Sequence, residues 1–181
     1  MRWIWIDKFI EFESSKRAVS VKNVSLAEEH LHDHFPGYPV MPGSLMIEAM
    51  AQTGGILVGE ARQFEEKVIL AKISKAIFHD LARPGDQLIL EARAENIAPE
   101  AASIKGTIHC GDILVAEIDI LFSHIDQNMA GLEFPEENFV FNEQFMNILQ
   151  LYKPTDKSVP QIVIPIGYEN SWQGPMYLFS G

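Results

Sequence analysis

Two residues close together in the chain, His34 and Glu48, have the types and the setting needed for proton transfer. A histidine titrates near neutral pH, so His34 suits the role of a general base. Glu48 lies among apolar neighbours and loses water on folding, so it must find a partner or keep a proton. It is therefore an acid candidate, with a hydrogen-bonded core glutamate as the alternative. The pair predicts acid–base chemistry on one substrate.

The stretch around these residues, HFPGYPVMPGSLMIEAMAQTGGILVG, indicates how they are held. Pro36-Gly37 suits a tight turn, because proline presets φ and glycine accepts a positive φ. Pro42 can begin a helix, and the apolar run from Gly43 to about Arg62 predicts a long buried one. The N–H groups of its first turn offer a place for negative charge. One side of this helix carries its polar and small residues, namely Ser44, Glu48, Gln52, Gly55 and Gly59.

Strand-like segments lie on both sides of the predicted helix. Trp3–Glu13 and Arg17–Val24 have β-rich composition, and Ser14-Ser15 suits the turn between them. An antiparallel sheet wrapped around one long central helix covers such a helix on most sides, so the predicted fold class is α+β. After the helix we expect a meander of about four strands, at Lys67–Lys75, Gln87–Asn96, Ala101–Cys110 and Ile113–Ser123.

The motif HFPGxPxxPGxLxxEAMAQ resembles the signature of the 3-hydroxyacyl-acyl-carrier-protein dehydratases of the FabZ type, which have a hot-dog fold. Phe78 and the later RPGDQLILE resemble the second recognisable patch of that family. The resemblance runs from about Ile6 to Ser123 and implies a hot-dog domain over residues 1–125. It also implies an enzyme of fatty acid biosynthesis that removes water from 3-hydroxyacyl thioesters to give trans-2-enoyl thioesters.

The resemblance further implies roles for five residues. His34 and Glu48 are the catalytic base and acid, contributed by different subunits of a homodimer, and the N–H of Gly43 stabilises the oxyanion. Gln52 and Phe78 take substrate-binding positions. From the residues alone, Gln52 either orients Glu48 or satisfies buried backbone groups, and Phe78 suits a core or tunnel wall. The family uses no metal or organic cofactor, its substrates are carried by acyl carrier protein or coenzyme A, and a trimer of dimers is a further assembly.

Two departures from the family pattern bear on function. Asp33 precedes the histidine, where the family has a small residue, commonly glycine. His79 and Asp80 follow Phe78, where basic residues are usual, so docking of an acidic carrier needs other cations. The candidates for that docking are Lys72, Lys75 and Arg83. Two alternative functions remain at this point: a hot-dog acyl thioesterase and a non-catalytic acyl-binding or assembly protein.

Composition and charge argue against several other classes of protein. A formal net charge of −11 disfavours nucleic acid as a partner. Glu48 and Gln52 interrupt the longest apolar run, so no membrane span is expected. Arg2 breaks the N-terminal apolar stretch, which therefore does not resemble a signal peptide. The single Cys110 excludes an intrachain disulfide and fits a reducing compartment. We therefore expect a soluble, cytoplasmic protein.

Residues 126–181 have a different character, with seven acidic and two basic residues. We predict an acidic C-terminal extension that is packed on the core or on a neighbouring subunit. Asn142–Leu151 has apolar residues at helical spacing, and Gln161–Ile166 suits a strand. The apolar residues expected to make the contacts are Phe145, Ile148, Leu149, Trp172 and Phe179.

Three histidines form an H-x-H-x-H pattern before the turn, at His30, His32 and His34. On an extended segment all three would face one way, which is an arrangement that suits a metal ion. The helix motif already gives His34 a catalytic role. We therefore predict no metal site and interpret His30 and His32 as solvent-facing loop residues.

Overall fold

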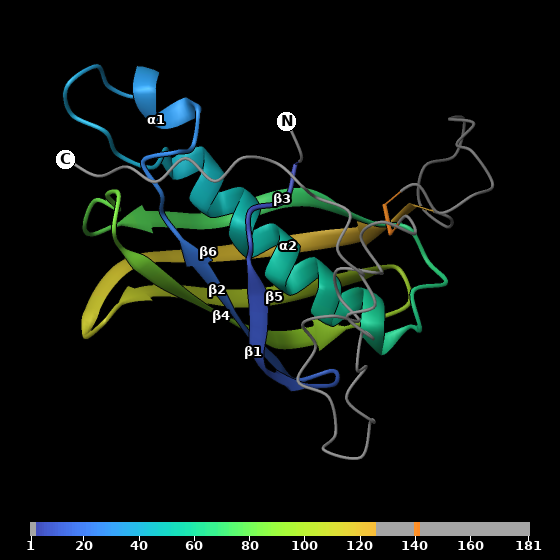
Figure 1. Cartoon of the computed structure of the whole chain (residues 1–181). Helices are drawn as coiled ribbons and strands as arrows, with labels where there is room; N and C mark the ends of the chain where they lie inside the picture. The colour runs from blue at the N-terminus through green and yellow to red at the C-terminus, as the bar shows by residue number, and fades with distance from the viewer. Residues whose placement is uncertain (1–2, 126–139, 142–181) are drawn as a thin grey trace, which may run out of the picture.

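A computed structural model describes residues 3–125 and 140–141 of the chain (Figure 1). One long helix lies across one face of a six-stranded antiparallel sheet. This confirms the predicted α+β architecture, and most element bounds fall within a few residues of those expected. In chain order the elements are β1 (Lys8–Glu13), β2 (Arg17–Asn23), α1 (His30–Asp33), α2 (Gly43–Ala61), β3 (Val68–Phe78), β4 (Gln87–Ile97), β5 (Ala101–Cys110) and β6 (Ile113–His124).

The strand order across the sheet is β1-β2-β4-β5-β6-β3. The predicted meander is correct for β4, β5 and β6 but wrong for β3, which pairs with β6 at the far edge. The reason is the path of the chain across the sheet. Helix α2 carries it from β2 to the opposite edge, where β3 forms, and β4 then returns to pair with β2. Strand β3 is consequently paired on one side in the described chain.

Close contact with the sheet explains why α2 needs small residues. A Cβ atom added at Gly54 would lie 2.7 Å from Cδ1 of Ile104 on β5. On the sheet side, a Cβ at Gly106 would lie 2.5 Å from Sδ of Met50 and 2.6 Å from the carbonyl oxygen of Ile118. Real Cβ atoms do not approach so closely, so glycine at both positions lets the helix and sheet pack without a gap.

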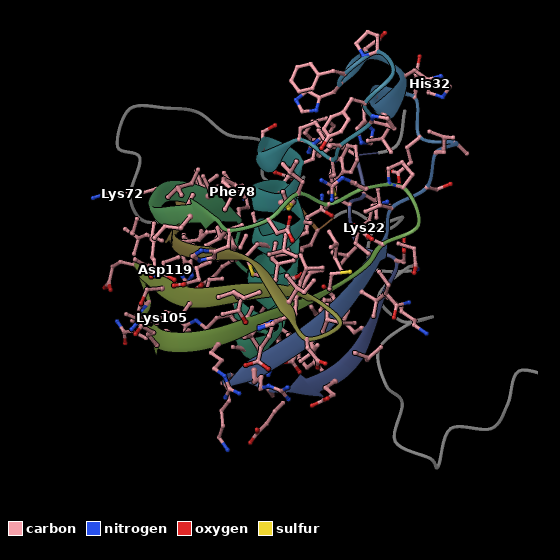
Figure 2. The ribbon with its side chains drawn as sticks, turned by 90° about the vertical axis from the view of Figure 1, so that its left-hand side faces the viewer. Lys22, His32, Lys72, Phe78, Lys105 and Asp119 are labelled. Carbon is pink, nitrogen blue, oxygen red and sulfur yellow. The ribbon has the colours of Figure 1, made fainter. Side chains whose placement is uncertain are left out.

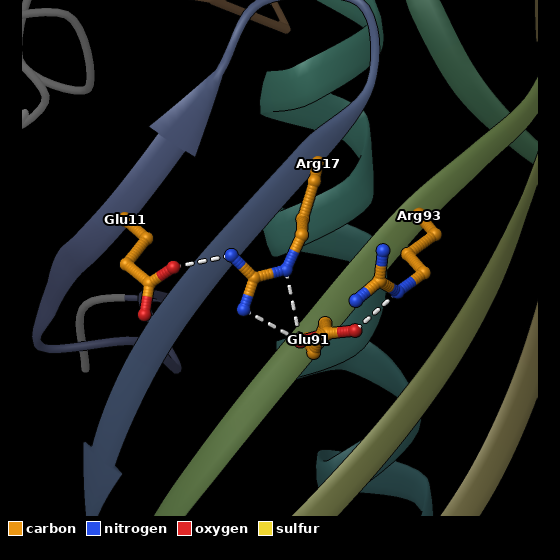
Figure 3. A network of polar contacts seen from close by, with 4 residues as sticks. All are labelled: Glu11, Arg17, Glu91 and Arg93. Atoms are coloured by element: carbon orange, nitrogen blue, oxygen red, sulfur yellow. Dashed lines mark hydrogen bonds and ion pairs between the residues drawn. The ribbon is translucent and has the colours of Figure 1, made fainter.

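Three adjacent strands carry a network of charged side chains on the face away from α2, as Figure 3 shows. Arg17 on β2 donates from Nε and Nη2 to Oε2 of Glu91 on β4, at 2.9 and 2.7 Å, and from Nη1 to Glu11 on β1. Arg93 donates to the other oxygen of Glu91. The hydrogen bond to Glu91 raises the pKa of Arg17. On β4 these charges alternate with buried Leu90 and Ala92, which is the period-two pattern of a half-covered sheet, whereas β2 is buried continuously from Ala18 to Lys22.

The segment before the histidine turn is helical rather than extended. The turns that lead into it begin at Ser25, whose N–H donates to Oε1 of Glu28 at 2.8 Å while its Oγ accepts from the N–H of Ala27 at 3.2 Å. The helix itself begins at His30 after Glu29, which makes no side-chain capping hydrogen bond. Leu31 on α1 is buried and fixes the short helix to the core. The interpretation of His30 and His32 as loop residues is therefore wrong, because both lie on α1.

Most of the predicted extension lies outside the described residues, including the expected helix at Asn142–Leu151 and strand at Gln161–Ile166. The division at residue 125 stays a prediction. Phe141 is described, and it is 8% exposed. Its ring lies 5.0 Å from that of Phe64 and covers Gly59, where an added Cβ would be 2.5 Å from Cζ.

Within the described part of the chain, no helix is long and apolar enough to cross a membrane.

Replacing Phe141 by alanine should destabilise the protein, because a buried aromatic ring would leave a cavity against α2. The expected loss is about 3–5 kcal/mol of unfolding free energy, measured by urea denaturation. Leu26→Ala, at a side chain that is 58% exposed, is the control and should change stability little. An unchanged denaturation midpoint in Phe141→Ala would show that this contact does not anchor the chain.

Candidate active site

The imidazole of His34 is held at the end of α1 by the backbone that follows it. Its Nδ1 lies 2.9 Å from the carbonyl oxygen of Val40, while the N–H of Val40 donates to the carbonyl of His34, also at 2.9 Å. A carbonyl oxygen can only accept, so neutral His34 carries its proton on Nδ1. The lone pair on Nε2 is then available to take a proton. Phe35 stacks on the ring, with the centroids 4.2 Å apart.

The other two histidines of the pattern have different surroundings. His30 is partly buried, with its ring 5.2 Å from that of Trp5, and burial lowers its pKa. The interpretation of His30 as a solvent-facing residue is therefore wrong. His32 is exposed as expected, and its Nε2 lies 3.2 Å from the carbonyl oxygen of Leu26. Among the described residues there is no group of three or more His, Cys, Asp or Glu that could hold a metal ion.

Glu48 is half-buried on α2 and accepts a hydrogen bond from Gln52 one turn later, with 3.0 Å between Oε1 and Nε2. The same Gln52 amide also binds the backbone of the N-terminal segment. Its Nε2 donates to the carbonyl of Trp3 at 3.0 Å, and its Oε1 accepts from the N–H of Trp5 at 2.8 Å. Both interpretations of Gln52 are thus correct, since it orients the acid candidate and satisfies backbone groups.

Gly43 is the first residue of α2, and Phe78 covers it. A Cβ at Gly43 would lie 2.9 Å from Cζ of Phe78, so the ring rests against the start of the helix. Phe78 is labelled in Figure 2. Helix geometry leaves the first-turn N–H groups without intrahelical acceptors, and the helix dipole adds positive potential there. Phe78 is 42% exposed and shields this end on one side only. The geometry suits a site for a developing oxyanion.

Within the described chain, His34 and Glu48 do not hydrogen-bond to each other. His34 is bound to Val40 and Glu48 to Gln52. The sequence-predicted residues therefore form two groups in one subunit. One group is the histidine turn, and the other is the side and start of α2.

Charges near the end of β3 are largely paired with one another. Glu117 on β6 binds Lys75 and His79, with 3.1 Å to Nε2 of His79, and the hydrogen bond from Lys75 lowers the pKa of Glu117. Arg83 donates to the hydroxyl of Tyr38 at 3.1 Å. Lys72, labelled in Figure 2, forms no ion pair with the described residues.

Comparison with known proteins identifies the family. The model of the FabA-like domain matches residues 3–119, which carry both groups of site residues. A 3-hydroxyacyl-acyl-carrier-protein dehydratase FabZ from Caldanaerobacter subterraneus subsp. tengcongensis is 40% identical over 121 residues, which is 66% of this chain and 86% of that protein. This chain is a FabZ-type member of the FabA-like domain family.

Two further comparisons agree with that assignment. A FabZ dehydratase from Hydrogenobaculum sp. is 44% identical over 115 residues, covering 62% of this chain and 78% of that protein. Among solved structures, the dehydratase heterocomplex ApeI:P from Xenorhabdus doucetiae matches with a TM-score of 0.57 at 16% identity, over 69% of this chain and 85% of that chain. At this identity the match speaks for the fold alone, and it confirms the hot-dog fold.

Sequence patterns did not identify some of the residues that shape this FabZ-type site. Val40, which orients His34 through its carbonyl, is an ordinary apolar residue in the motif. Trp3 and Trp5 act through backbone groups, and backbone groups leave no side-chain pattern to detect. Helix α1 was also missed, because it has four residues and its N-cap residue, Glu29, makes no side-chain capping hydrogen bond.

The tautomer of His34 can be tested directly. When the imidazole of His34 is neutral, ¹⁵N NMR should report a protonated Nδ1 and an unprotonated Nε2, because the carbonyl of Val40 needs a donor. His32 offers an internal control, since its Nε2 faces the carbonyl of Leu26 and should be the protonated nitrogen. A proton on Nε2 of His34 would contradict the orientation described for the site.

Proposed function

We propose that this FabZ-type protein is a 3-hydroxyacyl thioester dehydratase of fatty acid biosynthesis. The observation that carries the proposal is the hydrogen bond from Nδ1 of His34 to Val40, which leaves a basic nitrogen free in a chain of this family. The relatives that match are named as 3-hydroxyacyl-acyl-carrier-protein dehydratases. A cytoplasmic location is part of the proposal and accords with the single free Cys110.

In the proposed reaction, Nε2 of His34 takes the proton from the carbon next to the thioester carbonyl. The electron pair of that C–H bond moves into an enolate, whose oxygen is stabilised by the first-turn N–H groups near Gly43. As the enolate collapses, the carbon–oxygen bond at C3 breaks and Glu48 gives a proton to the leaving hydroxyl. The products are water and a trans-2-enoyl thioester, and proton return from His34 to Glu48 completes the cycle.

The proposal includes a homodimer with shared sites. Strand β3 is an edge strand in the described chain and exposes apolar side chains that are about two-fifths accessible, namely Leu70, Ile73, Ile77 and Phe78. An exposed apolar edge strand offers unpaired N–H and C=O groups with which a strand of another chain can pair. Pairing at β3 would bring a second subunit next to Phe78 and Gly43. This supports a site in which His34 and Glu48 come from different subunits, in keeping with their separate partners here.

We propose that the acyl group is carried by an acyl carrier protein, as named for the relatives. Few of the candidate cations in the described chain are available to form ion pairs with that carrier. Lys75 is paired with Glu117, and Arg83 with Tyr38, so these two cations are already engaged. Lys72 on β3 is the remaining one of the three candidates without an ion pair among the described residues. Coenzyme A carries the same phosphopantetheine arm and is the second acyl carrier to test.

Substitution of either catalytic residue should remove most of the activity. His34→Ala and Glu48→Gln should each lower kcat by about 10²-fold or more, because each loses one proton-transfer group. The double variant should be little worse than either single one, since the two groups act as a unit. The assay follows enoyl thioester formation from 3-hydroxybutyryl and longer thioesters, with thioester hydrolysis recorded alongside. His32→Ala is the matched control and should keep wild-type turnover. Near-normal turnover in either His34→Ala or Glu48→Gln would contradict the assignment of these residues as catalytic.

Mixed dimers test whether the site is shared. Co-expressed His34→Ala and Glu48→Gln chains should regain roughly a quarter of wild-type activity, because half the dimers are mixed and each has one intact site of two. If both residues served one site within a chain, every site would keep one defect and mixing would restore nothing. The two chains are co-expressed because preformed dimers exchange subunits slowly. Two different affinity tags, one on each chain, verify that the dimers are mixed.

A further inference from the structure

The amide of Gln52 joins Glu48 to a part of the chain that the reaction does not otherwise use. Its three hydrogen bonds go to Oε1 of Glu48, to the carbonyl of Trp3 and to the N–H of Trp5, at 3.0, 3.0 and 2.8 Å. Gln52 is half-buried, and two of its partners are backbone groups of a single short segment, Trp3–Trp5. This segment precedes β1 and lies 47 to 49 positions away in the chain.

The two backbone contacts fix which way the amide of Gln52 faces. The N–H of Trp5 can only donate, so its partner must be the amide oxygen. The carbonyl of Trp3 can only accept, so its partner must be the amide nitrogen. A reversed amide would set two oxygens against each other at Trp3 and leave the N–H of Trp5 without an acceptor, which costs free energy in a partly buried site. The NH₂ group therefore faces Glu48.

An N–H donor at Oε1 of Glu48 makes the two carboxyl oxygens unequal. Oε1 is occupied as an acceptor, so a proton on this carboxyl is placed on Oε2. We propose that the segment Trp3–Trp5 is a positioning element of the active site, which acts through Gln52 to make Oε2 of Glu48 the atom that gives its proton to the leaving hydroxyl. This inference rests on the proposed function for the role of Glu48.

The segment has the rigidity that such a role needs. The side chain of Trp5 is 5% exposed, and its ring makes edge contacts with Trp3 at 5.6 Å and with His30 at 5.2 Å between centroids. The ammonium group of Lys22 lies 5.9 Å from the centre of the Trp5 ring. The carbonyl of His30 in turn accepts the N–H of His34 at 3.1 Å. Trp5 is thus packed against the element that carries the base and bonded to the residue that orients the acid.

The first experiment replaces Gln52 by methionine, which has a similar length but cannot donate. We expect kcat to fall about 10-fold or more with KM little changed, because a hydrogen bond to an ionisable group at the reacting centre is lost. The limb of the pH–kcat profile that belongs to Glu48 should move to higher pH, since a donor to the ionised form has gone. Gln52→Glu should move it further, because two adjacent carboxyls share a proton. A merely structural role would lower the melting temperature and leave that limb in place.

The second experiment isolates the N–H of Trp5. Trp5→Pro and Trp5→Ala both lose the indole ring, but only proline lacks the N–H that holds Oε1 of Gln52. We expect kcat of Trp5→Pro to be about 10-fold below that of Trp5→Ala, with the same limb moved to higher pH. Equal kcat values and equal pH profiles for the two variants would overturn the role of the segment.

A third measurement does not depend on turnover. The carboxyl carbon of Glu48, followed by ¹³C NMR in the intact protein, should titrate at higher pH in Gln52→Met than in wild type. An unmoved titration would overturn the inference even if the enzyme is a dehydratase. If the titration moves while Glu48→Gln keeps full activity, the amide contact is real and the proposed function has failed instead. The two failures are therefore distinguishable.

Discussion

The close contact between α2 and the sheet is the constraint on which the rest of this structure depends. The helix is apolar on nearly all sides, so it is stable only when the sheet covers one side and other segments cover the remainder. Gly54 and Gly106 let the backbones approach, and Met50 fills the space between. The sheet curves to meet the helix and turns its charged residues to the other face. Gly43, Glu48 and Gln52 are placed by α2 itself, whereas His34 is placed by α1 and Val40.

Much of this arrangement could be predicted from the chain, and the reasons for the failures are physical. Alternation and turn residues located the strands, and one dense motif located the helix, His34 and Glu48. Local periodicity cannot say which strands pair, so the position of β3 beside β6 was missed. Contacts made by backbone groups, such as the N–H of Trp5 on Gln52, have no signature in residue type. Helix α1 was missed because a four-residue helix without a side-chain cap leaves little signal in a polar segment.

The two ends of α2 serve different purposes. Its first turn, at Gly43, lies under Phe78 and beside the proposed chemistry, whereas Gly59 near its last turn is covered by Phe141. These glycines are about 24 Å apart along the helix axis. The family match ends at residue 119, so Phe141 belongs to the part of the chain beyond it. One helix thus connects the site within the matched residues to a contact made by a residue beyond them.

The link between Trp5 and Gln52 also has a consequence for the order of events during protein synthesis. The ribosome makes Trp5 before His34 and Glu48, yet the acceptor of its N–H is made 47 residues later. At about 5–20 residues per second, the N-terminal segment waits roughly 2–10 s for its partner. Strand β2 must likewise wait for β4, its neighbour in the sheet. The residues that emerge first therefore wait for partners made later, and the geometry of the acid is completed only after Gln52 has been synthesised.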